Sequence, residues 1–131
     1  MVGRIELPRF QSEILLDFVI DTGSSQTILP FFAAELMSVD PNLFEREREG
    51  YGVGGSAMLK EEPAVLKFND GDFEYEYRII VGCHPAPNDV PALLGRDILN
   101  KWHLQIDRSR GLLAGEPRQW DSRRPIGPLA D

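Results

Sequence analysis

The chain has 131 residues, of which 42% are hydrophobic and 27% charged, values typical of one globular domain with its own core. Its net charge of -7 argues against nucleic acid or an anionic membrane as a partner, because phosphate groups require a positive protein surface. The single cysteine excludes an intrachain disulfide, and neither a long apolar run nor a leader-like N-terminus is visible, so we expect a soluble cytoplasmic protein.

The elements expected along the chain are mostly strands, because β-forming residues recur in short runs between turns that contain glycine or proline. In chain order, strands are predicted at residues 4–7, 13–20, 27–29, 64–68, 73–81, 92–95, 104–107 and 111–114. A glycine-rich hairpin is expected at residues 51–56, after a charge run at 45–49 that is typical of a solvated loop or strand face. Residues 84–91 contain three prolines and predict a loop.

Two segments favour a helix. Residues 31–37 follow a proline and contain several helix formers, while residues 96–102 place their apolar side chains on one helical face. The residues therefore predict an all-β domain with one short helix near the C-terminus. We expect this domain to span residues 1–115, and the polar, proline-bearing residues 116–131 to form a strap or a disordered tail.

Three segments contain residue types that suggest a site. They are Asp21, Thr22, Gly23 and Ser24 in a turn after a buried strand; Tyr51, Gly52, Val53, Gly54 and Gly55 in the hairpin; and Leu93, Leu94 and Gly95 before the late helix, with Arg96 at its start. Each segment alone is weak evidence, since Asp-Thr-Gly can be a structural turn and Leu-Leu-Gly can be core. The hairpin lacks the Lys-Ser/Thr pair that a phosphate-binding loop requires.

Together and in this order, the three segments resemble the retropepsin family of aspartic proteases, over roughly residues 14–114. The most specific parts are FVIDTGSSQTIL at residues 18–29 and ALLGRDIL at residues 92–99. The resemblance implies a closed acid-protease barrel, hydrolysis of peptide bonds, a homodimeric enzyme and no metal or other cofactor. Its substrate would be an extended peptide or an unfolded protein.

The chemistry of such a site requires two carboxylates. One acts as a base toward water while the other protonates the carbonyl oxygen, and two like charges about 3 Å apart share a single proton. This chain contains one Asp-Thr-Gly turn and is too short for a two-lobed enzyme with two such turns. The second carboxylate therefore has to come from Asp21 of a second copy, related by a two-fold axis.

The resemblance also implies roles for the neighbouring residues. Thr22 would link the two turns across the dimer, and the backbone of Gly23 would contact substrate. The hairpin at residues 51–55 would be a flap that closes over an extended peptide, which binds by strand addition. Residues 93–95 would pack beneath the turn and hold it in place.

One departure from the family concerns the arginine that opens the late helix. Retroviral enzymes pair this arginine with acidic residues at the positions that Ser25 and Gln26 occupy here. Arg96 therefore needs another partner, and we expect either Asp97 or a backbone carbonyl.

Two other interpretations of the sequence remain possible. The same fold could serve as a catalytically silent module for dimerisation or peptide binding, which would not require the carboxylate, or the Asp21 turn could be structural in an unrelated β-barrel. A metal site is not expected, because His84 and His103 have no partners at ligand spacing. Cys83 is expected to be a small buried hydrophobic residue rather than a nucleophile.

Overall fold

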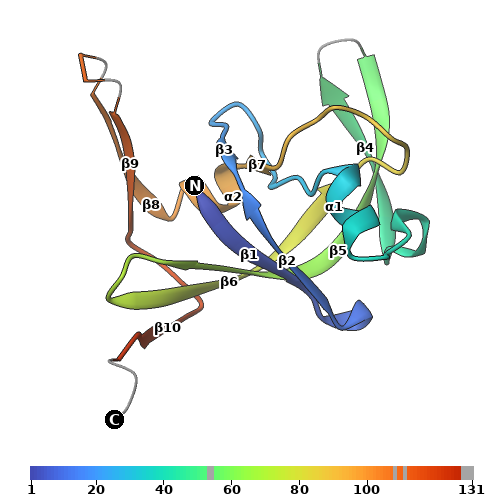
Figure 1. The fold of residues 1–131 in the computed structure, drawn as a ribbon. Coiled ribbons are helices and arrows are strands. Elements are labelled where there is room, and N and C mark those ends of the chain that lie inside the picture. The colour runs from blue at the N-terminus through green and yellow to red at the C-terminus, as the bar shows by residue number, and fades with distance from the viewer. Residues whose placement is uncertain (53–54, 108, 111, 128–131) are drawn as a thin grey trace.

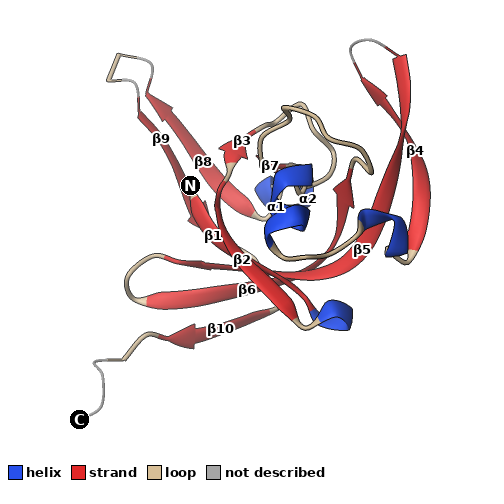
Figure 2. Cartoon of the chain, turned by 45° about the vertical axis from the view of Figure 1, so that its right-hand side comes forward, coloured by secondary structure: helices blue, strands red, loops and turns tan. Residues whose placement is uncertain are grey.

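The computed structural model describes residues 1–52, 55–107, 109–110 and 112–127, with only the backbone of residues 50–52, 55–57, 112 and 113. The described chain is mostly β (Figures 1 and 2). Its strands are β1 (Val2–Leu7), β2 (Ser12–Asp17), β3 (Val19–Ile20), β4 (Arg46–Gly52), β5 (Gly55–Asn69), β6 (Phe73–Cys83), β7 (Leu93–Leu94), β8 (Trp102–Asp107), β9 (Leu112–Pro117) and β10 (Ser122–Pro125). The helices are α1 (Phe31–Leu36) and α2 (Arg96–Leu99), with 3-10 turns η1 (Pro8–Phe10) and η2 (Pro41–Leu43).

The largest sheet is organised around β5, which is 15 residues long. The strand order is β10-β6-β5-β1-β2, and β4 also pairs with β5, so β5 meets β4 along its first half and β1 along its second. All these pairings are antiparallel. The pairing path runs from β10 to β2 without returning on itself in the described residues, so closure into a barrel stays a prediction.

The predicted alternation of β6 is confirmed, because Tyr75, Tyr77, Ile79 and Val81 are buried on one face of the strand. They join the core, where the indole N–H of Trp102 donates a hydrogen bond of 2.8 Å to the hydroxyl of Tyr77. Pairing the two polar atoms allows both large rings to be buried without an unsatisfied group.

The predicted strand at residues 13–20 is two strands, separated at Phe18. The N–H of Phe18 still donates to the carbonyl of Met1, at 2.8 Å, but the N–H of Val19 donates to the carbonyl of Ala92, also at 2.8 Å. The chain thus leaves the large sheet at Phe18 and pairs in parallel with β7. The strand predicted at residues 27–29 is reduced to isolated bridges from Ile28 to Gly82 and to Leu93.

The predicted helix at residues 96–102 is wrong beyond Leu99, because Trp102 begins β8. The physical reason is tertiary: the carbonyl of Lys101 accepts the N–H groups of Arg118 and Gln119, at 2.8 and 3.0 Å. These bonds place residue 101 at the end of the β8–β9 hairpin. The helix predicted at 31–37 forms as α1, so the described chain has a second short helix besides the one near the C-terminus.

The described residues after Glu116 run back to the large sheet. β9 continues to Pro117, and β10 then pairs with the edge of β6. The ring of Trp120 lies 5.2 Å from that of Tyr75. No helix in the described residues is long and apolar enough to cross a membrane.

Candidate active site

The Asp-Thr-Gly turn begins where the β3–β7 pair ends. The N–H of Asp21 donates to the carbonyl of Leu94, at 3.0 Å, which continues the parallel pairing by one residue. Leu94 is fully buried, so this pairing attaches the first residue of the turn to the core. The backbone of Asp21 is therefore fixed, while the residues that follow leave the sheet.

The carboxylate of Asp21 is oriented by its own turn. The N–H of Gly23 donates to Asp21 Oδ1, at 2.9 Å, and the N–H of Ser24 donates to the Asp21 carbonyl, at 3.2 Å. Asp21 is partly exposed, and both Thr22 and Gly23 are exposed. The turn therefore leaves an oriented carboxylate partly accessible to solvent at the start of a supported loop.

Arg96 stabilises the turn through two hydrogen bonds. Its guanidinium donates to the carbonyl of Thr22, at 3.1 Å, and its backbone N–H donates to the carbonyl of Ser24, at 2.8 Å. Of the two partners expected for Arg96, the backbone carbonyl is confirmed. Asp97 is engaged elsewhere, with Thr27.

Thr27, which is buried, and Asp97, which is partly buried, are hydrogen-bonded to each other next to the turn. Asp97 accepts hydrogen bonds from the N–H and the hydroxyl of Thr27, at 3.0 and 2.7 Å. The hydroxyl of Thr27 also accepts the N–H of Gly95, at 3.2 Å. Burial raises the pKa of the Asp97 carboxyl, although the hydrogen bonds from Thr27 and Ile98 act in the opposite direction.

Gly95 is required by close packing of two backbones. A Cβ at this position would lie 2.4 Å from the backbone carbonyl carbon of Gln26. The predicted packing of residues 93–95 against the turn is thus present in the geometry: Leu93 and Leu94 pair with β3, and Gly95 contacts the loop that carries Asp21. The catalytic roles of all these residues stay predictions.

The described residues of the predicted flap belong to the β4–β5 hairpin. Tyr51 pairs with Ser56 and Gly52 pairs with Gly55, while Val53 and Gly54 lie outside the described residues. The β4–β5 hairpin and the β8–β9 hairpin extend on opposite sides of the loops that follow β3 and precede β7 (Figure 2).

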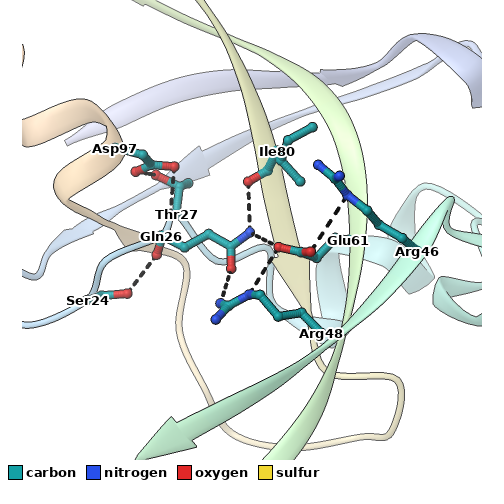
Figure 3. A network of polar contacts seen from close by, with 8 residues as sticks. All are labelled: Ser24, Gln26, Thr27, Arg46, Arg48, Glu61, Ile80 and Asp97. Carbon is teal, nitrogen blue, oxygen red and sulfur yellow. Dashed lines mark hydrogen bonds and ion pairs between the residues drawn. The ribbon is translucent and has the colours of Figure 1, made fainter.

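A set of polar residues near the turn was missed by the sequence interpretation. Gln26 contacts Glu61 of β5 and Arg48 of β4, as Figure 3 shows. The only sequence signal was the charge run at 45–49. It does form an exposed strand face as predicted, but nothing in it indicated a partner on the loop that carries Asp21.

The other residues considered for chemistry contribute no second site. Cys83 is fully buried, and burial raises the pKa of its thiol to about 12, which makes it a poor nucleophile. In the described part of the chain, no group of three or more His, Cys, Asp or Glu residues is arranged to hold a metal ion.

No family model and no curated protein matches this sequence. Among solved structures, the chain is similar to "EIAV protease complexed with the inhibitor HBY-793", with a TM-score of 0.48 and 22% sequence identity. The matched region covers 76% of this chain and 83% of that chain. A similarity of this strength carries no argument about activity, which has to come from the residues of this chain.

Proposed function

We propose that this chain is an aspartic endopeptidase that works as a homodimer, with Asp21 of each copy supplying one of two catalytic carboxylates. The observation that carries the proposal is the partly exposed Asp21 carboxylate, which accepts the Gly23 N–H at 2.9 Å. Its turn is attached to the core through Leu94 and braced by Arg96. Asp40 and Asp70 accept the same kind of bond in exposed turns, so it is the attachment to Leu94 and the hydrogen bonds from Arg96 that set the Asp21 turn apart.

Two such turns facing each other across a two-fold axis could hold one proton and one water between their carboxylates. The ionised carboxylate takes a proton from the water, which attacks the peptide carbonyl carbon, while the protonated carboxylate donates its proton to the carbonyl oxygen. The carboxylate that took the proton from water then gives it to the amine nitrogen, the other carboxylate recovers a proton from a hydroxyl of the tetrahedral intermediate, and the C–N bond breaks to leave a carboxylic acid and an amine. No covalent intermediate or cofactor is needed.

The substrate in this proposal is an extended peptide or an unfolded protein. Backbone groups of Gly23 and of the hairpin at residues 51–55 would bond to the main chain of the substrate, so that affinity depends little on its sequence. Thr22 would join the two turns across the dimer. We expect the enzyme to work in a reducing compartment, as the use of one buried cysteine suggests.

The proposal is tested by incubating the wild-type chain with a denatured protein mixture over a range of enzyme concentrations and identifying the fragments by mass spectrometry. Peptide fragments are expected, and the activity per chain should fall on dilution because the dimer dissociates into incomplete sites. Absence of cleavage at concentrations where the chain is dimeric would contradict the proposal and favour a silent module for dimerisation or peptide binding.

A further inference from the structure

A cluster of polar side chains connects the β4–β5 hairpin to the loop that carries Asp21 (Figure 3). The amide nitrogen of Gln26 donates to Glu61 Oε2, at 2.7 Å, and to the carbonyl of Ile80, at 3.0 Å. The guanidinium of Arg48 donates to Gln26 Oε1, at 2.6 Å, and to Glu61 Oε2, at 3.2 Å. Gln26, Arg48 and Glu61 therefore form a closed ring of hydrogen bonds.

One end of this cluster is rigid. The hydroxyl of Ser24 donates to the carbonyl of Gln26, at 2.6 Å, and Gly95 packs directly against the Gln26 backbone. Gly82 leaves room for the Gln26 side chain, because a Cβ there would lie 2.9 Å from Gln26 Oε1. Gln26 is therefore a fixed point on the same loop as Asp21.

The other end is a two-stranded ribbon. In the described residues, β4 pairs with β5 alone, and the pairing of β5 with β6 begins only at Lys60. Within the described part of the chain, the outer part of the hairpin, residues 48–52 and 55–59, has no third strand beside it, and two-stranded ribbons twist and bend more readily than wider sheets. Glu61 lies where this ribbon joins the body of the sheet, next to the point where the ribbon would bend.

The charges of the cluster favour a strong contact, here called the tie, between the β4–β5 hairpin and the loop that carries Asp21. The Glu61 side chain is 10% exposed and lies near two guanidinium groups, at 3.2 Å from Arg48 Nε and 3.7 Å from Arg46 Nε. A poorly solvated carboxylate holds its charged partners more strongly than an exposed one does. Elsewhere on the hairpin, Glu47 pairs with Lys60 through a side chain that is 54% exposed.

We propose that Glu61 is a positioning residue which, through Arg48 and Gln26, sets the angle of the β4–β5 hairpin relative to Asp21. The inference rests on the proposed protease function, since a fixed hairpin angle matters only if the hairpin covers a substrate. Without Glu61, two arginines lose the anion between them and the ribbon loses its tie to the loop. The carboxylate of Asp21 itself keeps its own hydrogen bond from Gly23.

The test compares Glu61→Gln with the matched control Glu47→Gln, which removes a carboxylate from the exposed ion pair of the same hairpin. Amide hydrogen exchange is measured by mass spectrometry on the hairpin and on residues 21–30, and kcat/KM is measured on a peptide substrate. Glu61→Gln is expected to accelerate exchange in both segments and to lower kcat/KM by about 10- to 100-fold, mainly through a higher KM. Glu47→Gln is expected to change neither.

A second variant provides a control in case Glu61→Gln simply unfolds the protein. Gly82→Ala pushes on the Gln26 side chain and removes no charge, so it should shift exchange and KM in the same direction by a smaller amount. If the wild type cleaves peptides but both variants show unchanged exchange in residues 21–30, or unchanged kcat/KM, the positioning role of Glu61 is wrong. The proposed protease function would stand in that case. An inactive wild type would overturn the proposed function and the positioning role together, and the exchange data would then still decide whether the tie exists.

Discussion

Replacing Asp21 by asparagine is expected to remove peptide cleavage while leaving the fold intact. Asparagine has the same shape and keeps an oxygen that can accept the N–H of Gly23, now at 2.9 Å from Oδ1. It can neither accept a proton from water nor deliver one to a carbonyl oxygen, so a dimer of this variant has no acid and no base. General acid–base groups of this kind contribute about 100- to 10 000-fold, and kcat/KM on a peptide substrate should fall by at least that factor.

The matched control is Asp72→Asn, which makes the same chemical change in the exposed turn between β5 and β6. Its activity should equal that of the wild type, and both variants should keep the circular dichroism and melting temperature of the parent. Retention of activity in the Asp21 variant would show that the cleavage comes from another group or from a contaminating protease.

Gly95→Ala is expected to cause the largest loss of stability among single substitutions at the site. The added Cβ would lie 2.4, 2.5 and 2.8 Å from the carbonyl carbon, oxygen and nitrogen of Gln26, all of them backbone atoms. These atoms cannot move aside cheaply, because the Gln26 carbonyl accepts the Ser24 hydroxyl and the Ser24 carbonyl accepts the N–H of Arg96. Overpacking of this kind costs about 3 kcal/mol, a large share of the stability of a single domain.

Thermal unfolding should show this loss as a fall of roughly 10 °C in Tm. Gly127→Ala is the control, since an added Cβ there meets no atom within 4 Å, and its Tm should match that of the wild type. The backbone of Gly95 is extended, with φ of -93°, so the expected effect comes from contact and not from backbone strain. A Gly95→Ala protein as stable as its parent would mean that β7 and the Gln26 loop are farther apart than described.

The sequence predicted those strands whose burial follows from the alternation of residues along a short segment. The alternation from Phe73 onward indicated a strand with one buried face, and β6 has that face. The break at Phe18 could not be predicted, because a run rich in β-forming residues does not reveal that its two halves pair with different strands. The helix predicted to reach Trp102 ends at Leu99 for a similar reason: bonds to residues 118 and 119 decide where it stops.

The same distinction applies to the site. The Asp-Thr-Gly turn and the Leu-Leu-Gly segment could be singled out, because each combines unusual residue types in a short stretch. The role of Gln26 could not, since its partners Arg48 and Glu61 lie 22 and 35 residues away in the sequence. A glutamine in a loop and an arginine in a charge run carry no local signal of their contact. Only the packing of the hairpin base against the loop brings them together.

Mixing wild type with Asp21→Asn tests most directly whether one site is built from Asp21 of two copies. The two proteins are combined at equal amounts and allowed to exchange subunits at a fixed total concentration at which the chain is dimeric. Random pairing leaves about one quarter of the dimers with two aspartates, so activity should fall to about a quarter of that of wild type alone. A fall to about one half, as expected for independent sites within single chains, would contradict the account.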